Sequence, residues 1–403
     1  MSRVVSADLQ PIFDSRGHST VEATIVLESG ARGRAGAPSG ASTGVHEARA
    51  FPDGGAPAAL RLFPQSVAPR LAGVDAADRS AVDGALHAAD GTSDFSKIGG
   101  NTATAVSVAA AIAHATESGV PLWRVLARPG VEVPAFPAIV GNCLNGGRHA
   151  IGGPDIQEFI AFAEARRPDE SVRAAVRVHE ILGQELHRRY PTLALGRGDE
   201  GGWVAPIGNV EALELLGAAC ERARDELKTE VRPGVDLAAS EFYRDGAYRY
   251  RDRTLNDEEQ VAFVAQLVDR YGIRYVEDPL HEEAFDDFAA LTRAIGDRSV
   301  VVGDDLYCSR VERLERGIAL GSSNAILIKV NQVGTLTDAL ATVDLARGRG
   351  LATVTSHRSG DLPEGWLAHL AIATGARGLK CGVLGGERVA KLNELLRLGR
   401  ATG

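Results

Sequence analysis

Polar side chains stand at the ends of five short apolar runs in the C-terminal half of the chain. Each run is closed or followed by one such residue: Glu277, Asp304, Lys329, His357 and Lys380. The steps between them are 27, 25, 28 and 23 residues, the length of one strand, one helix and their loops. Because the C-terminal ends of barrel strands meet at one face, we expect two carboxylates, two lysines and a histidine in one active-site mouth.

A third acid, Asp236, lies at the end of an earlier predicted strand. Three carboxylates that face one cavity repel each other unless a cation lies among them, and carboxylate oxygens with room for water favour Mg²⁺. Each acid taken alone could instead be a surface residue or a helix cap. The position of all three at strand ends favours a metal site.

The two lysines suggest acid–base chemistry. The segment that follows the fourth of the five apolar runs suggests an anion-binding site. A lysine near other cations loses proton affinity and can act as a base, although a surface ion pair remains open for Lys329 and Lys380. Arg358 and Ser359 follow His357, and such donors can bind phosphate oxygens.

Two glycine-rich segments are ambiguous by themselves. Gly198–Gly202 contains Glu200, which could be a turn residue or an acid, and Asn145–His149 precedes the pair Gln157-Glu158. The Ser39–Gly44 loop is rich in hydroxyls but lacks the lysine of a nucleotide-binding P-loop, so a lid is the better interpretation.

The surrounding pattern predicts an α/β protein with two parts. Residues 1–131 read as an α+β N-terminal domain, with strands on either side of Ser29-Gly30 and helices over 57–72, 76–90 and 102–118. Residues 132–403 read as a TIM-like β/α barrel. Its helices are expected over 168–188, 257–270, 282–295, 309–319, 334–348 and 363–374.

The amino-acid composition limits the classes of partner that the protein can bind. The net charge is −9 and there is no basic block, which argues against nucleic acid and requires any anion site to be built locally. No apolar run is long enough to span a membrane. Four scattered cysteines and the absence of a signal-peptide pattern favour a reduced, cytoplasmic setting.

Taken together, the segments resemble the enolase (phosphopyruvate hydratase) family over about 390 residues. The matching stretches occur in the family's order: Phe13–Gly17, Ser39–Glu47, Asn145–His149, Gln157–Phe159, Gly198–Gly202, Asp236 with Ser240–Phe242, Glu277–Pro279, Gly303–Asp305, Lys329–Gln332, Ser356–Gly360, and Lys380 with Val389–Asn393. Each motif is modest alone, but eleven in register are highly specific.

The resemblance implies a cytoplasmic hydro-lyase of glycolysis with two Mg²⁺ ions, which dehydrates 2-phosphoglycerate to phosphoenolpyruvate through an enolate. It implies these roles: Asp236, Glu277 and Asp304 as ligands of one Mg²⁺; Ser42 as a lid ligand of the second; Lys329 as base; Glu200, helped by Glu158, as acid; Lys380 on the substrate carboxylate; Arg358 and Ser359 on the phosphate; and His149, Gln157 and His357 lining the pocket. A pair matching Glu22 and Arg397 implies a homodimer.

The departures from the family pattern lie around the pocket. Arg148 replaces a small residue, the Gly201–Pro206 segment is one residue longer, and Gly360–Glu364 replaces an acidic run. Arg148 could pair with an extra carboxylate, so a carboxyphosphono form of 2-phosphoglycerate, as in phosphinothricin-type biosynthesis, is an alternative substrate. A non-catalytic scaffold is a third hypothesis, opposed by the complete set of predicted ligands and lysines.

Overall fold

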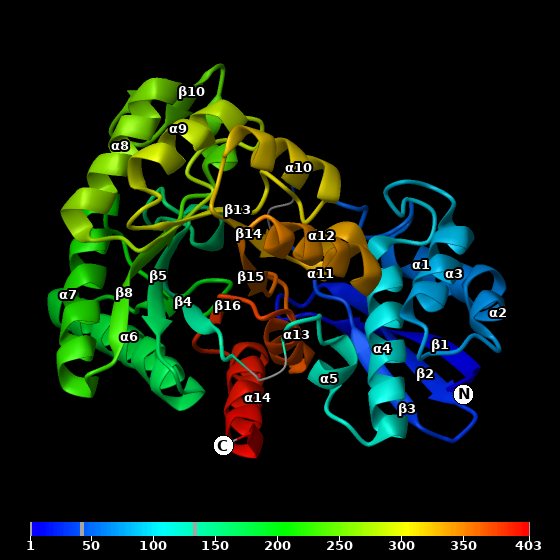
Figure 1. Ribbon diagram of the computed structural model, residues 1–403. Helices are drawn as coiled ribbons and strands as arrows, with labels where there is room; N and C mark the ends of the chain where they lie inside the picture. Colours follow the sequence, from blue (N-terminus) through cyan, green and yellow to red (C-terminus); the bar gives the residue numbers. More distant parts are fainter. Residues whose placement is uncertain (1, 41–43, 132–134, 403) are drawn as a thin grey trace.

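The computed structural model describes residues 2–40, 44–131 and 135–402. It has an antiparallel sheet with helices at the N-terminal end and a closed barrel after it, as Figure 1 shows. The predicted fold, an α+β part followed by a TIM-like barrel, is confirmed. The exact boundary between residues 131 and 132 adjoins undescribed residues and stays a prediction. Within the described residues, no helix combines the length and apolarity needed to cross a membrane.

The N-terminal part is a three-stranded meander covered by helices. Its elements are β1 (Val4–Phe13), β2 (Ser19–Leu27), β3 (Arg32–Gly36), α1 (Gly55–Ser66), α2 (Ala68–Leu71), α3 (Arg79–Asp90), α4 (Gly100–Ser118) and α5 (Leu122–Leu126). The alanine-rich α4 packs directly on β2 and β3. A Cβ atom at Gly33 would lie 2.0 Å from the carbonyl oxygen of Ala109, so glycine is required for this close approach.

Eight strands close into the barrel. They are β4 (Ala138–Asn145), β5 (Glu158–Glu164), β8 (Glu230–Asp236), β12 (Tyr275–Glu277), β13 (Val300–Gly303), β14 (Ala325–Ile328), β15 (Ala352–Ser356) and β16 (Gly378–Gly382). Neighbours pair in chain order, and β16 pairs with β4 to complete the ring. Side chains such as Phe162, Tyr275 and Leu327 fill the interior, as in a packed barrel core.

One strand departs from the parallel pattern that the repeated spacing predicted. Strand β5 runs antiparallel to both β4 and β8. Between β4 and β5 the chain forms only a one-turn 3₁₀ helix, η1 (Gly147–His149), and a parallel connection needs a longer crossover. The strand therefore returns in the opposite direction, and its first residue, Glu158, lies at the same barrel face as the ends of the parallel strands.

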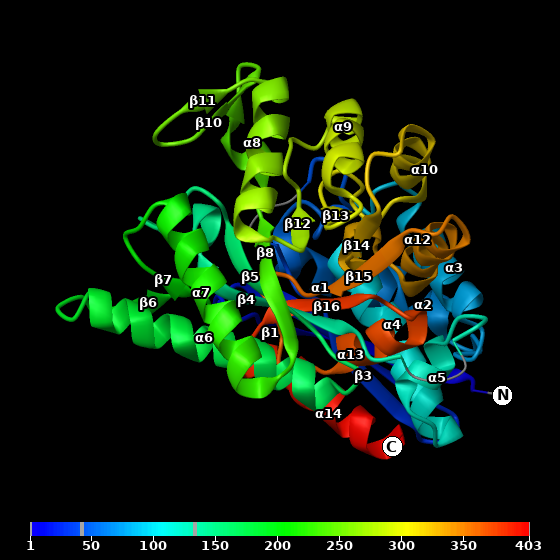
Figure 2. The same cartoon turned by 60° about the vertical axis from the view of Figure 1, so that its left-hand side comes forward.

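The helices of the barrel lie outside its strands, as Figure 2 shows. They are α6 (Pro168–Arg189), α7 (Asn209–Leu227), α8 (Asp257–Tyr271), α9 (Phe285–Ile295), α10 (Val311–Leu320), α11 (Val330–Val333), α12 (Leu336–Gly348), α13 (Trp366–Thr374) and α14 (Gly386–Thr402). The smaller elements are β6 (Gly196–Arg197), β7 (Trp203–Val204), η2 (Ala239–Phe242), β9 (Tyr243–Arg244), β10 (Ala247–Arg249) and β11 (Thr254–Leu255). All predicted helices are present, whereas α7, α14 and the short helices α5 and α11 were not predicted.

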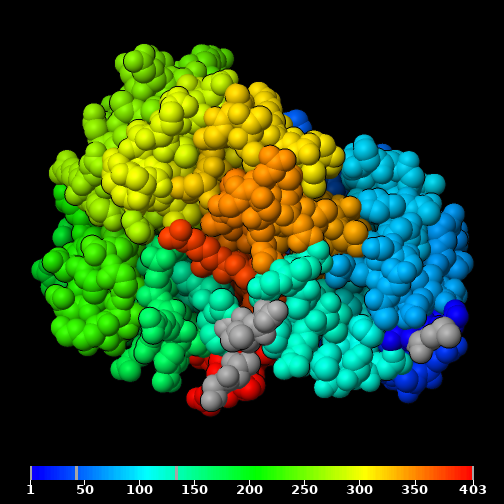
Figure 3. All heavy atoms as spheres, viewed as in Figure 1, coloured from blue at the N-terminus to red at the C-terminus, as the bar shows by residue number. Residues whose placement is uncertain are grey.

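The N-terminal part packs against the side of the barrel near α11 and α12, the blue-cyan and orange regions of Figures 1 and 3. Thr104 of α4 donates a hydrogen bond of 2.9 Å to the carbonyl of Gly334. Ser39 and Gly360 form an antiparallel bridge with two backbone hydrogen bonds of 2.8 Å. The described start of the predicted lid loop is thereby joined to the segment that contains Arg358 and Ser359.

Candidate active site

Three carboxylates lie side by side across neighbouring barrel strands. The register pairs Glu158 of β5 with Asp236 of β8, and Asp236 with Glu277 of β12. Between them lies the ammonium of Lys380, whose Nζ is 2.9 Å from Asp236, 2.6 Å from Glu277 and 3.2 Å from Glu158. All four side chains are at most 6% exposed, so these charges interact in a largely water-free environment.

Burial and the nearby Asp236 raise the pKa of Glu277 to about 8. For Lys380, burial alone would lower the pKa, but the carboxylates, first Asp236 and then Glu158 and Glu277, raise it well above its usual value. Lys380 is therefore a fixed cation in this state and partly balances the acidic cluster.

Lys329 and Asp304 form a second buried pair. Asp304 follows β13 directly, Lys329 follows β14, and the ammonium donates to Oδ2 of Asp304. Gln332 donates to the other carboxylate oxygen over 2.9 Å. Burial opposes the charge of Lys329, but Asp304 outweighs it and raises the lysine's pKa. Lys329 is thus held protonated here and needs release from Asp304 before it can accept a proton.

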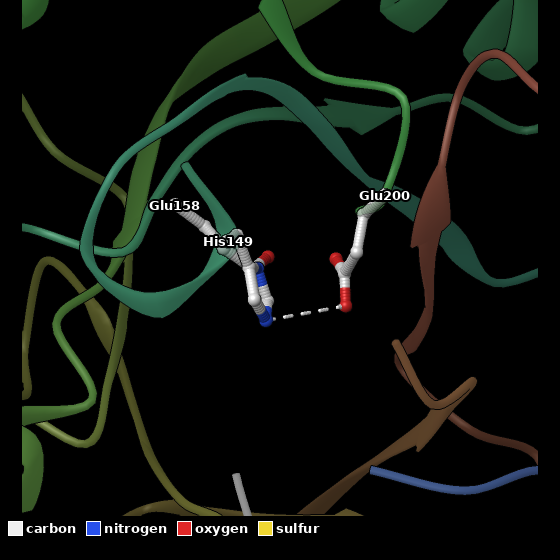
Figure 4. A group of neighbouring side chains, drawn as sticks. All are labelled: His149, Glu158 and Glu200. Atoms are coloured by element: carbon white, nitrogen blue, oxygen red, sulfur yellow. Dashed lines mark ion pairs between the residues drawn. The ribbon is translucent and has the colours of Figure 1, made fainter. Parts of the chain in front are cut away.

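Glu158, Glu200 and His149 form a further group of neighbouring side chains, as Figure 4 shows. His149 Nδ1 lies 3.8 Å from Glu158, and its Nε2 lies 4.0 Å from Glu200. Asn142 of β4 donates to Oε2 of Glu200 over 3.0 Å, and His357 Nε2 lies 3.1 Å from the same oxygen. Both distances from His149 exceed a direct hydrogen bond, so proton transfer to or from its ring would need a bridging water or a small shift of the ring.

The environments of the two glutamates differ. Burial and the charge of Glu200 raise the pKa of Glu158 well above its usual value. Burial also disfavours the charge of Glu200, but His357 and His149 outweigh it and hold its pKa well below the usual value. The surroundings therefore shift the two carboxyl groups in opposite directions, Glu158 toward its protonated form and Glu200 toward its ionised form, an arrangement suited to acid–base work.

Arg358 is nearly buried and links the two parts of the molecule. Its guanidinium donates to both carboxylate oxygens of Glu47, over 2.8 and 3.1 Å, and to Asn331 over 3.0 Å. Glu47 belongs to the N-terminal part, next to the predicted lid loop. A cation fixed in this way is preorganised to receive an anionic substrate group.

These side chains surround one polar cavity. Its lining is Gly40, His149, Gln157, Glu158, Glu200, Asp236, Asp304, Lys329, Ser356, His357, Arg358, Ser359 and Lys380. Among the described residues, buried polar atoms without a hydrogen-bond partner include His149 Nδ1, Gln157 Oε1 and Glu158 Oε2. Unpaired buried polar atoms are costly, so this group fits a site that receives a polar ligand.

The acidic residues also fit a metal ion. Asp236, Glu277 and Asp304 supply hard oxygen donors whose charges are now balanced by lysines. Asp278 and Asp305 lie with Asp304 in a group close enough to share an ion. The backbone of Asp278 has a positive φ of 38°, and its carboxylate accepts the N–H groups of Asp304 and Asp305 over 2.9 and 2.8 Å. Asp278 thereby fixes the direction of Asp304.

The structure brings together twelve of the fourteen predicted catalytic, substrate-binding and metal-ligating residues. Eleven of them line the cavity, and Glu277 accepts a hydrogen bond from Lys380. Arg148 lies on an adjoining pocket, where its Nε is 2.6 Å from Glu241 and its side chain is 56% exposed. Ser42 lies outside the described residues. The functional roles of all of them stay predictions.

Sequence models of two domains match this chain. The enolase N-terminal domain matches residues 4–126 and the enolase C-terminal TIM barrel domain matches residues 133–403. The chain belongs to the enolase family. Enolase of Halorubrum lacusprofundi is 46% identical over 401 residues, with 99% of both chains covered. Enolase of Methanothermobacter thermautotrophicus is 45% identical, with 97% of this chain and 94% of the relative covered. Enolase of Picrophilus torridus is 39% identical, with 98% of both covered.

Some residues of this enolase-family site were missed by the sequence analysis. Asn142, Glu47 and Gln332 contact predicted site residues, and Arg388 contacts His357. Glu47 and Gln332 lie within stretches that resemble the family, and this resemblance was the signal that could have identified them. Asn142 lies in an otherwise apolar strand, and Arg388 in the first turn of a helix that was not predicted, so neither had a chemical pattern to distinguish it.

Proposed function

We propose that this chain catalyses the Mg²⁺-dependent, reversible dehydration of 2-phosphoglycerate to phosphoenolpyruvate, and is therefore a hydro-lyase. The observation that carries this proposal is the full-length relationship to enolases, combined with carboxylates, lysines and Arg358 around one polar cavity. A net charge of −9 would repel such a substrate, so these local cations are needed to bind it.

Lys329 is the base in this proposal. Removing a proton beside a carboxylate creates a doubly charged enolate, and one unit charge pair at about 4 Å is worth roughly 4 kcal/mol at an effective dielectric of about 20. Lys380 would face the substrate carboxylate and Arg358 with Ser359 the phosphate. Bound Mg²⁺, held by Asp236, Glu277 and Asp304 with a second ion at Ser42, would supply the remaining positive charge.

The glutamate pair supplies the acid. The raised pKa of Glu158 favours its protonated form, and Glu200 lies close to it, so Glu200, helped by Glu158, would protonate the departing hydroxyl. His149, Gln157 and His357 would line the substrate pocket. Lys329 contacts Asp304 and the glutamate pair contacts His149, so base and acid occupy distinct parts of the mouth, as an elimination requires.

Neither alternative function gains support from the described residues. Arg148, the reason to consider a carboxyphosphono substrate, pairs with Glu241 on an adjoining pocket. Comparing both substrates with Arg148→Ala tests that alternative: a greater loss for the modified substrate would favour it, and equal losses would count against it. The scaffold hypothesis is opposed by the intact acid, base and ligand set.

We also propose a cytoplasmic homodimer. All four cysteines are buried and unpaired, which suits a reducing compartment. In the single chain, Arg34 lies 3.5 Å from Glu22 and Arg397 lies 2.6 Å from Glu394. A dimer built like that implied by the family resemblance would pair Glu22 with Arg397 of the second copy. Sedimentation of wild type and Arg397→Ala would test this, because a wild-type monomer would refute it.

The activity is tested by following the ultraviolet absorbance of phosphoenolpyruvate in a mixture of protein, 2-phosphoglycerate and Mg²⁺. The proposal expects turnover that stops when a chelator is added and returns with excess Mg²⁺. Lys329→Ala is the matched control for a contaminating enolase, because it should lose the activity while remaining folded. Folded wild-type protein without turnover would refute the proposal.

A further inference from the structure

Arg388 lies completely buried in the first turn of α14, directly behind the cavity. Its NH1 group lies 2.6 Å from Nδ1 of His357 and 3.1 Å from Oδ2 of Asp361. The same guanidinium donates to the backbone carbonyls of Arg358 and Ser359, over 2.7 and 2.6 Å. It also donates to the carbonyl of Asp199 over 2.9 Å, and Asp199 precedes Glu200.

The contact with Nδ1 determines which ring nitrogen of His357 carries the proton. A guanidinium has only donor groups, so Nδ1 must offer its lone pair to Arg388. Neutral histidine then carries its proton on Nε2. Burial, above all, and the neighbouring Arg388 lower the pKa of His357 to about 4, against the opposing effect of Glu200, so the ring is neutral at physiological pH.

The proton on Nε2 points toward Glu200. Nε2 lies 3.1 Å from Oε2, although the approach is bent from the ideal hydrogen-bond direction, so His357 contributes mainly the positive end of its N–H dipole. Asn142 donates to the same Oε2 over 3.0 Å. Because the Asn142 hydrogen bond and the Nε2–H dipole both stabilise negative charge on Oε2, the other oxygen, Oε1, is left to accept and pass on a proton. Oε1 is the atom that faces His149, at 4.0 Å.

We propose that Arg388 is a positioning residue that fixes His357 as its Nε2–H tautomer, and thereby makes Oε1 of Glu200 the oxygen that exchanges a proton with the substrate. The opposite tautomer would direct a lone pair at Oε2. A carboxylate and a lone pair repel, so Oε2 would then need a proton of its own. That proton would be retained between His357 and Glu200 and lost to the elimination step.

A neighbouring buried cation provides a control for a merely structural role. Lys391 lies one turn further along α14, 2.9 Å from Asp361, and donates to the carbonyls of Leu362, Glu364 and Glu387. It supports the same loop as Arg388 and shares the Asp361 counterion, but among the described residues its hydrogen-bond and ion-pair partners do not include His357. Loss of Lys391 therefore weakens the scaffold while leaving the contact with Nδ1 in place.

The tautomer can be observed directly by ¹⁵N NMR of full-length protein labelled at histidine, with the His357 signals assigned by their loss in His357→Gln. Wild type should show an unprotonated Nδ1 and a protonated Nε2. Arg388→Met should shift the proton mainly to Nδ1, whereas Arg388→Lys, which retains a donor, and Lys391→Met should keep the wild-type pattern.

A kinetic readout tests the consequence for Glu200. Arg388→Met should reduce kcat for dehydration by roughly 10²-fold, the usual contribution of general acid catalysis, with KM changed by less than about threefold. Exchange of the substrate's C2 proton with solvent, which depends on Lys329, should continue. Arg388→Lys should recover much of the lost kcat. Lys391→Met should change the rates of exchange and dehydration by the same factor.

A protonated Nδ1 in the wild type would overturn the proposal, even if every Arg388 variant failed to fold. An unchanged tautomer in folded Arg388→Met would overturn it as well, and so would equal losses of exchange and dehydration. The inference rests on the proposed function, but the two fail differently. Wild type without turnover would refute the function, whereas the NMR pattern tests Arg388 and His357 without any substrate.

Discussion

Nζ of Lys380 lies 2.6 Å from Oε1 of Glu277, with both side chains buried at the mouth of the barrel. Under the proposed function, the lysine meets the substrate and the carboxylate holds a metal ion. In the structure the ammonium donates a hydrogen bond to this carboxyl group, which lowers the cost of burying the two groups. On binding, the metal ion would therefore replace Lys380 as the partner of Glu277, and the substrate would replace Glu277 as the partner of Lys380.

Metal binding should stabilise the folded protein through this carboxylate. A ligand at a hundredfold excess over its Kd adds about 2.7 kcal/mol to the free energy of unfolding, so Mg²⁺ should raise the Tm of the wild type. Glu277→Gln should lose most of this increase, and Glu241→Gln, whose carboxylate pairs with Arg148 on the adjoining pocket, should retain it. Equal increases in both variants, measured by differential scanning calorimetry, would argue against the metal site.

Lys329 and Glu200 should affect separate steps. Lys329→Ala should abolish exchange of the substrate's C2 proton with solvent, because it removes the base. Glu200→Gln should retain exchange while losing dehydration by roughly 10²–10⁴-fold, because it cannot donate the proton. NMR in deuterated buffer reports exchange, and absorbance reports dehydration. The reverse pattern would mean that Glu200 is the base and Lys329 is the acid.

Gly382 should be needed to place Glu200. A Cβ atom at this position would lie 1.9 Å from the carbonyl oxygen of Glu200, so Gly382→Ala must displace the loop. A misplacement of about 1 Å can cost roughly 10²-fold in rate, and we expect a loss of that order in kcat. Gly217→Ala, in α7 with nothing within 4 Å of the new atom, should leave kcat unchanged. Similar kcat values for both variants would contradict this prediction.

The strand-end residues were predictable because their spacing and apolar surroundings carry the information. Asp236, Glu277, Asp304, Lys329 and His357 lie at or directly after strand ends, as the spacing predicted. Arg388 was not predictable, since its contact with His357 depends on how α14 packs beneath a distant loop. The direction of β5 was missed because the regular spacing begins only after it, and the pairing of Arg148 with Glu241 depends on tertiary structure.

Glu364 should make stability depend on pH. Burial raises its pKa from 4.5 to about 7, against the effect of the hydrogen bond from Gly36. The folded state thus holds this proton more tightly than the unfolded state. The contribution of this group to the free energy of unfolding is fully present below pH 4.5. It decreases by about 3 kcal/mol as the pH rises to about 7.

Urea unfolding at pH 5 and pH 8 measures this contribution. The decrease in unfolding free energy between the two pH values should be smaller in Glu364→Gln than in the wild type by about that amount. The other titrating groups are common to both proteins, so their contributions to the free energy of unfolding cancel in the comparison. An identical pH dependence in the two proteins would contradict the assignment to Glu364.

The central claim is that Lys329 removes a proton from 2-phosphoglycerate before the hydroxyl leaves. One NMR time course of 2-phosphoglycerate with folded wild-type protein and Mg²⁺ in deuterated water observes both events in the same sample. We expect deuterium at C2 together with phosphoenolpyruvate formation in the wild type, and neither with Lys329→Ala. Undiminished exchange and product formation by Lys329→Ala, or neither event with the wild type, would contradict it.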